Sequence, residues 1–166
     1  RPMRDRFGAI LPMQFYSQDE LVQILAANAK TLNLDLTTEI LCKIADYSRG
    51  TPRIANNFLK RLSDFVIHKQ IPKVSLNHLF EVFNLLGVND LGLNNLDLNF
   101  LRSLKRDFDG GPVGLKTISA CLSEDPEHIE DITEPFLIKL GFINRSQRGR
   151  ILTSKGDLII KDVLKF

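Results

Sequence analysis

The hydrophobic pattern of this chain changes its period once, after Gly141, and that change limits the possible folds more than any other feature. Between Gln18 and Gly141, apart from the stretch 88–95, the apolar residues recur at helical spacing. Beyond Gly141, two apolar pairs, Phe142-Ile143 and Ile151-Leu152, flank a polar stretch at 144–150 that contains Gly149. Two short strands joined by a polar, glycine-containing turn are typical of a β-hairpin. The sequence therefore predicts a mainly α chain with one small hairpin near its end.

Three helices are expected ahead of this hairpin. The first should end at Gly110-Gly111-Pro112, and the third should run from Asp125-Pro126 to Gly141. Pro135 should kink the third helix, because it has no N–H to offer the carbonyl of Asp131. The apolar stripes of the three helices are Leu98, Leu101, Leu104 and Phe108; Leu115, Ile118 and Leu122; and Ile129, Ile132, Phe136 and Leu140.

One more helix is expected after the hairpin. Thr153 should cap it, and Leu158, Ile159 and Val163 should point inward. Three helices followed by a hairpin with basic residues form the plan of a winged helix. We therefore expect a winged-helix domain over residues 96–166.

Residues 17–87 carry the signals of four further helices with short connections, which predicts a compact four-helix unit. Ser17 and Glu20 form a capping box ahead of a helix from Gln18 to about Leu32. The other boundaries are a start after Thr37 with a stop at Gly50, an N-cap at Thr51 before Pro52, and a start after Ser75 with a stop at Gly87. The Gly- and Asn-rich stretch 88–95 is expected to be the linker between the two domains.

Composition narrows the function classes only a little. The 166 residues are 43% hydrophobic and 25% charged, which fits one large domain or two small ones. No apolar run is long enough for a membrane helix, and no secretory signal is visible, so a soluble, cytoplasmic protein is expected. Cys42 and Cys121 stand far apart and are expected to be reduced. The net charge of +2 says little about partners, so any nucleic-acid affinity must come from local clusters of charge.

The motifs of an autonomous enzyme are missing from the sequence. It contains neither a G-x-x-x-x-G-K-[ST] phosphate loop nor a G-x-G-x-x-G turn. His68, His78 and His128 have no second ligand at metal-binding spacing, so no metal site is expected. By itself the chain is expected to be catalytically inactive.

The predicted hairpin carries the most suggestive cluster of charge. Arg145, Arg148 and Arg150 are three bases with no acid between them. Guanidinium groups suit phosphate oxygens, and such contacts read the backbone, so binding should be independent of sequence. The alternative is a solvated hairpin tip whose charges only aid solubility.

The helix before the hairpin has the opposite charge. A winged helix usually presents its third helix to the major groove of DNA. Here that helix carries a single base, Lys139, against five acids, which are Asp125, Glu127, Glu130, Asp131 and Glu134. Groove entry is therefore not expected, and the hairpin should make the main DNA contacts.

Two other basic positions leave two interpretations open. Arg53 lies in the first turn of a helix, where free amides and a cation suit a phosphate, although it also fits a solvated arginine. The start of the chain, with Arg4 and Arg6 around Asp5, fits either a solvated linker or an arginine finger directed at a neighbour's phosphates.

Several segments, taken together and in order, resemble the RuvB family of Holliday-junction branch-migration motors. They are Met3-Arg4-Asp5-Arg6-Phe7-Gly8, Phe15-Tyr16, Arg49-Gly50-Thr51-Pro52-Arg53-Ile54-Ala55-Asn56, Phe108-Asp109-Gly110-Gly111-Pro112-Val113-Gly114-Leu115, Ile129-Glu130-Asp131, Glu134-Pro135-Phe136-Leu137-Ile138, Gly141-Phe142 and Arg148-Gly149-Arg150. The resemblance implies an AAA+ ATPase without its N-terminal nucleotide-binding domain: a segment leaving that core at 1–16, a helical lid at 17–87 and a winged helix.

The resemblance also implies roles for single residues. Arg6 is similar to the arginine finger that acts on ATP in the adjacent subunit. Arg53 is similar to the sensor arginine that touches ATP in its own subunit. Tyr16 is similar to the residue lining the adenine pocket, although it also fits a plain hydrophobic staple before a capped helix. Arg145 and Arg150 are similar to DNA-contacting arginines of the wing.

The implied cofactor is ATP with Mg²⁺, bound mainly by the missing core. The implied partners are four-way junction and duplex DNA, five further copies of the chain in a homohexamer, and a RuvA-like junction-binding protein, in recombination, repair and the SOS response. The competing hypothesis is a non-catalytic winged-helix regulator or interaction module whose acidic third helix binds a protein.

Overall fold

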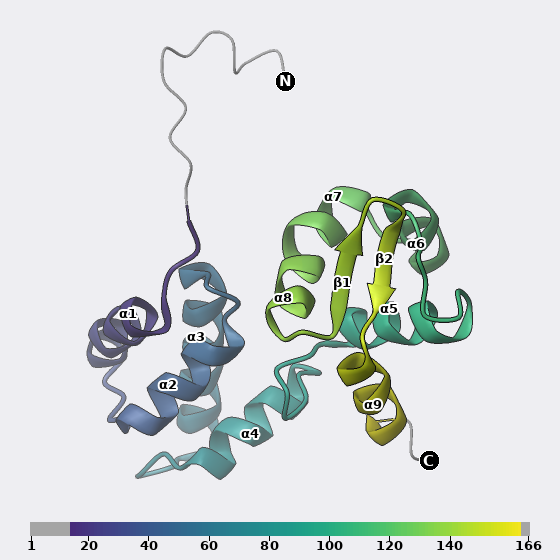
Figure 1. Ribbon diagram of the computed structural model, residues 1–166. Helices are drawn as coiled ribbons and strands as arrows, with labels where there is room; N and C mark the ends of the chain where they lie inside the picture. Colours follow the sequence, from purple (N-terminus) through teal and green to yellow (C-terminus); the bar gives the residue numbers. More distant parts are fainter. Residues whose placement is uncertain (1–13, 164–166) are drawn as a thin grey trace, which may run out of the picture. The chain divides into compact units, whose positions relative to one another are not determined.

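The computed structural model describes residues 14–163, and of Asp162 and Val163 only the backbone. The chain divides into two compact units that meet between Phe83 and Asn84. Each unit is described by itself, and Figure 1 labels their elements.

Four helices make up the first unit, as the sequence predicts. They are α1 (Gln18–Thr31), α2 (Thr38–Tyr47), α3 (Pro52–Lys69) and α4 (Leu76–Leu85), of which α4 crosses the division between the units. The capping box is confirmed: the Ser17 hydroxyl accepts from the Glu20 amide, and the Glu20 carboxylate accepts from the Ser17 amide at 2.8 Å. Thr37 caps α2 in the same way, through the amide of Ile40.

An aromatic cluster ties α2, α3 and α4 together. The ring of Phe83 lies 4.9 Å from that of Tyr47 and 5.1 Å, edge-on, from that of Phe58. Such pairs are favourable beyond the area they bury. The fully buried aliphatic residues around them are Leu21, Leu25, Ile40, Ile44, Leu59, Leu62 and Leu79.

The second unit has the predicted order of three helical segments, a hairpin and a last helix. Its elements are α5 (Asn95–Arg106), α6 (Leu115–Leu122), α7 (Pro126–His128), a π-helical turn (Ile129–Thr133), α8 (Glu134–Lys139), β1 (Ile143–Ser146), β2 (Gly149–Leu152) and α9 (Ser154–Val163). Leu93, from the expected linker 88–95, lies fully buried in the core of this unit, and Asn94 caps α5. The end of that stretch is therefore part of the second unit, which begins at Asn84.

The third helical segment is not one kinked α-helix. The amide of Glu134 donates to the carbonyl of Ile129, five residues back, so the chain makes a π turn there. Pro135 follows in the first turn of α8, where a missing N–H costs little. The sequence predicts a kink at Pro135, and the structure has a π turn directly before it, so that Pro135 lies at the start of a new α-helical segment.

The face through which the last helix packs is only partly the one predicted: Ile159 packs against the core as expected, but Leu158 does not. Leu158 was expected inside but is 60% exposed, whereas Ile160 is buried. The reason is Gly156, one turn before Ile160, which lies so close to the residue preceding β1 that a Cβ there would come 2.3 Å from the Phe142 carbonyl oxygen. This contact rotates Leu158 outward. The expected N-cap is confirmed, since Thr153 Oγ1 accepts from the Gly156 amide at 3.1 Å, while the side chain of Val163 lies outside the described residues.

Candidate nucleic-acid interface

The hairpin is short and closed by a two-residue turn. Its strands are antiparallel, with Ile143 opposite Leu152 at the base and Ser146 opposite Gly149 at the tip. The Ser146 hydroxyl donates to the Gly149 carbonyl at 2.9 Å and accepts from the Arg148 amide at 3.2 Å. The side chain of Ser146 therefore fixes the turn that carries Arg148.

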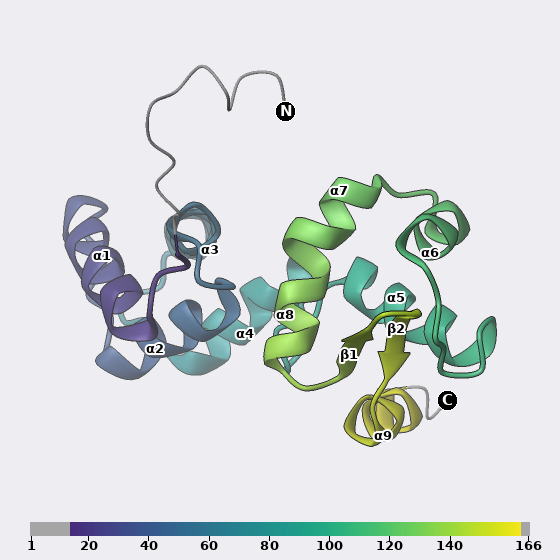
Figure 2. The ribbon, with the colours of Figure 1, turned by 45° about the horizontal axis from the view of Figure 1, so that its top comes forward.

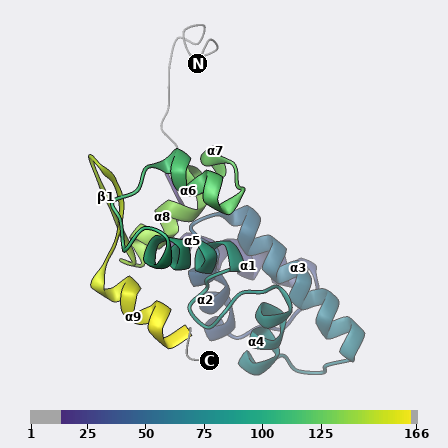
Figure 3. The ribbon, with the colours of Figure 1, turned by 90° about the vertical axis from the view of Figure 1, so that its right-hand side faces the viewer.

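A third segment flanks β2 on its other edge. Val113 and Arg150 exchange both backbone hydrogen bonds, at 3.0 and 2.8 Å. Gly149 has a φ of +132°, and a Cβ on it would lie 2.2 Å from the Val113 carbonyl oxygen. On the side of β1 lies α8, as Figure 2 shows. The hairpin thus has Val113 hydrogen-bonded along the outer edge of β2 and α8 packed beside β1, and from its base the chain enters α9 (Figure 3).

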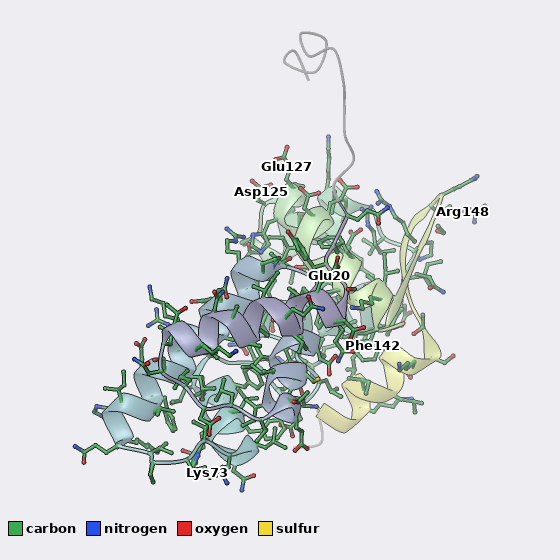
Figure 4. All side chains as sticks on the ribbon, turned by 90° about the vertical axis from the view of Figure 1, so that its left-hand side faces the viewer. Glu20, Lys73, Asp125, Glu127, Phe142 and Arg148 are labelled. Carbon is green, nitrogen blue, oxygen red and sulfur yellow. The ribbon has the colours of Figure 1, made fainter. Side chains whose placement is uncertain are left out.

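The three arginines of the hairpin occupy different environments. Arg148 sits in the turn, and Figure 4 shows its side chain pointing away from the unit. Within residues 14–163 it forms no ion pair. Arg145, on β1, is 53% exposed at its side chain and forms an ion pair with the carboxylate of Glu130.

Arg150 is not the surface residue that the sequence suggests. Its side chain is only 8% exposed, and its Nε and Nη2 donate to the two carboxylate oxygens of Glu134, at 2.5 and 3.2 Å. The cause is the register: Arg145 and Arg150 are cross-strand partners, so both side chains leave the same face of the hairpin. That face is directed at the helix carrying Glu130 and Glu134.

The sequence analysis treated Glu130 and Glu134 only as acids that repel DNA, and this role was wrong. They were counted as charge repelling DNA, yet both bind arginines of the hairpin. Their spacing of four residues, which places both on one helix face, is the signal that could have paired them with two bases on one hairpin face. Three exposed acids, Asp125, Glu127 and Asp131, still surround the start of this helical segment. Groove entry by it therefore remains disfavoured.

In the first unit, Tyr16 and Arg53 are brought to the same turn. The Tyr16 amide donates to the Gly50 carbonyl at 2.9 Å, and Gly50 lies three residues before Arg53. Gly50 has a φ of +71°, and a Cβ on it would lie 2.7 Å from Cβ of Phe15. Only glycine lets the segment of Tyr16 pack onto this turn. The Tyr16 side chain is 43% exposed.

The start of α3 is less completely capped than predicted. Thr51 has the backbone of an N-cap, but its hydroxyl makes no bond to the helix amides and lies 3.5 Å from the Arg49 carbonyl oxygen. Arg53 is exposed beside this end, and among the described residues its amide has no partner. Such a helix end, with a cation beside it, is suited to an anion. The remaining predicted site residue, Arg6, lies outside the described residues.

The described residues offer neither a metal site nor a membrane-spanning helix. Residues 14–163 contain no group of three or more His, Cys, Asp or Glu side chains placed to hold a metal ion. Within the same residues, each helix is too short or too polar to cross a membrane.

Two family models match the chain one after the other. The RuvB AAA lid domain matches residues 16–89, and the RuvB C-terminal winged helix domain matches residues 90–161.

Curated relatives agree with both models. The Holliday junction branch migration complex subunit RuvB of Orientia tsutsugamushi (strain Boryong) is 46% identical over 154 residues, which are 93% of this chain and 47% of that protein. Its counterpart in Helicobacter acinonychis (strain Sheeba) is 46% identical over 160 residues, or 96% of this chain and 47% of that protein. The chain thus spans about half the length of the curated relatives it matches.

A solved structure agrees as well. The Thermotoga maritima RuvB Holliday junction branch migration motor superposes with a TM-score of 0.88 at 33% identity. The match covers 96% of this chain and 54% of the Thermotoga chain.

Proposed function

This chain belongs to the RuvB family, and from that premise we propose that it supplies the lid and the DNA-gripping winged helix of an ATP-dependent motor for Holliday-junction branch migration. The whole motor would act in recombination and repair as a homohexamer, on four-way junction and duplex DNA, together with a RuvA-like junction-binding protein. The proposed setting is the cytoplasm, during the SOS response.

The observation that carries the DNA part of the proposal is Arg148, held by a fixed turn and pointing away from the unit. Arg145 stands beside it at the surface and can offer its guanidinium to a phosphate. Arg150 would act mainly as a structural residue, because its buried ion pair with Glu134 orients the hairpin. Only its Nη1, which Glu134 does not bind, would be available for a DNA contact. The contacts made by the hairpin would be with phosphates rather than base edges, so binding should be largely independent of sequence.

The nucleotide part of the proposal rests on the start of α3. The incompletely capped helix end and the exposed Arg53 fit an anionic phosphate, and Tyr16 on the adjoining turn fits the base. In the motor, Arg53 would sense ATP of its own subunit, and Arg6 would reach ATP of the next subunit as an arginine finger. ATP and Mg²⁺ would be held mainly by a core domain with the phosphate loop that this sequence lacks. The chain by itself should therefore not hydrolyse ATP.

The DNA proposal is tested by titrating this 166-residue chain with a four-way junction and with duplexes of unrelated sequence at several salt concentrations. We expect similar affinities for all sequences, with log K falling linearly against log salt. An absence of any salt-dependent DNA affinity would favour the alternative, a non-catalytic interaction module that binds a protein through its exposed acids Asp125, Glu127 and Asp131.

The nucleotide proposal needs the full-length motor. Arg6→Ala should leave ATP binding intact but slow hydrolysis strongly, because a finger acts only on the transition-state charge. Arg53→Ala should change the response of the lid to bound nucleotide. An unchanged hydrolysis rate in Arg6→Ala would remove that residue from the active site, and ATP turnover by the isolated chain would contradict the proposed division of labour.

A further inference from the structure

Glu130 stands between two arginines of the hairpin. Its Oε1 accepts from Nη2 of Arg145 and lies 3.9 Å from Nη2 of Arg150. The Arg150 guanidinium is already held by both oxygens of Glu134. The four side chains thus form a row in which Glu130 is the only counter-ion of Arg145 among the described residues.

The two ends of this row differ in exposure. Glu134 and Arg150 are 2% and 8% exposed, so their pair is sealed from water. Glu130 and Arg145 are 39% and 53% exposed. Ion pairs at such exposure are screened and contribute about 0–1 kcal/mol, so the outer pair can exchange partners easily while the inner one cannot.

We propose that Glu130 is an internal competitor of DNA phosphate for Arg145. The inference rests on the proposed DNA contact of the hairpin. A carboxylate and a phosphate present similar oxygens to the guanidinium fork, so each can replace the other there. Arg145 must give up all or part of its bond to Glu130 when it takes a phosphate. The hairpin then grips DNA less tightly than its three arginines alone would.

A lower affinity suits a contact with DNA phosphate that has to be broken and formed again. Because Glu130 recaptures Arg145 when the phosphate leaves, the arginine is never left without a partner. Glu134 cannot play this part, since its own arginine is buried and fixed. The competition is therefore specific to the outer pair.

The test is a double-mutant cycle on the 166-residue chain, with duplex DNA titrated at one fixed, moderate salt concentration. Glu130→Gln should raise the affinity about two- to fivefold, the equivalent of removing one surface ion pair. Arg145→Ala should lower the affinity. The gain from Glu130→Gln should disappear when Arg145 is already alanine, because the competitor then has nothing to compete for.

Removing any acid near DNA also raises affinity through long-range charge, so a matched control is needed. Glu127→Gln removes the same charge one helical turn earlier, from an exposed side chain that forms no ion pair within the described residues. Glu127→Gln should raise the DNA affinity less than Glu130→Gln does, and this smaller gain should persist when Arg145 is also replaced by alanine. Circular dichroism of each variant reports whether the surface substitutions leave the fold intact.

Three outcomes overturn the inference and remain distinct from one another. A gain from Glu130→Gln that persists without Arg145 makes Glu130 an ordinary repelling charge. A loss of affinity in Glu130→Gln makes it a residue that orients Arg145. If Arg145→Ala leaves the affinity unchanged, the proposed DNA contact of Arg145 itself fails, whatever Glu130 does.

Discussion

Arg150 and Glu134 form a two-point ion pair inside the second unit, with Nε to Oε1 at 2.5 Å and Nη2 to Oε2 at 3.2 Å. The pair joins β2 to the first residue of α8. Since both side chains are almost fully buried, neither can lose its partner without leaving a charge in the interior. The position of the hairpin therefore depends on this one contact more than on any exposed ion pair.

Arg150→Ala should destabilise the chain strongly, by roughly 3–5 kcal/mol in the free energy of unfolding, because it leaves Glu134 charged and buried. Urea unfolding monitored by circular dichroism measures this loss. Arg145→Ala is the matched control, because it removes the same group from the cross-strand partner position in an exposed pair, and it should cost at most about 1 kcal/mol. Replacing Arg150 and Glu134 together by Met and Leu should recover part of the loss, and equal losses in the two single arginine variants would contradict the burial argument.

Arg148→Ala should weaken DNA binding by a similar factor for every sequence tested. One phosphate contact fewer lowers the magnitude of the slope of log K against log salt by about 1. The control is Arg61→Ala, which removes the same charge from a surface pair with Asp64 in the first unit and should leave the slope unchanged. A sequence-dependent loss in Arg148→Ala would indicate base contacts instead of backbone contacts.

Gly149→Ala should loosen the hairpin. The new Cβ would lie 2.2 Å from the Val113 carbonyl oxygen, and φ is +132°, so we expect a loss of at least about 1–3 kcal/mol. Thermal unfolding measures it. Gly114→Ala is the control in the same segment, because its nearest neighbour outside the adjacent residues is Thr117 Oγ1 at 3.8 Å, and there the cost should stay below about 1 kcal/mol. Similar losses in both variants would mean that the close approach at Gly149 does not matter.

Lys105 should control the titration of Asp157. The ammonium groups first of Lys105 and then of Lys161, each 2.7 Å from a carboxylate oxygen, lower the pKa of the Asp157 carboxyl below its ordinary value. A lowered pKa in the folded state means that the charged form adds stability above the ordinary pKa, and that this contribution is lost as pH falls through the lowered one. Lys105→Ala should raise the pKa of Asp157, and Lys161→Ala should raise it less, as a carboxyl carbon NMR titration would show. A larger rise in Lys161→Ala would reverse the assigned order.

Features encoded within a few residues could be predicted from the sequence. The capping box of Ser17 and Glu20, the cap at Thr153 and the hairpin between Gly141 and Thr153 each depend on a local pattern, and all three are confirmed. The predicted order of helices is confirmed for the same reason, since each apolar stripe defines its own helix.

Features that depend on pairing between segments could not be predicted. Whether Arg150 faces water or a carboxylate depends on the register of β1 and β2, and a change of one residue would reverse its face. The outward position of Leu158 depends on the contact of Gly156 with the Phe142 backbone. The π turn before Pro135 has no signal in the apolar pattern, because that pattern continues at helical spacing through it.

The pair of backbone hydrogen bonds between Val113 and Arg150 also has a mechanical consequence. A hairpin attached only at its base would swing when its tip is loaded. Here the strand next to the tip is braced by Val113 on one edge, and its Arg150 is anchored by Glu134. A force applied to Arg148 is therefore expected to be transmitted to the helices of the unit, with little bending of the hairpin itself.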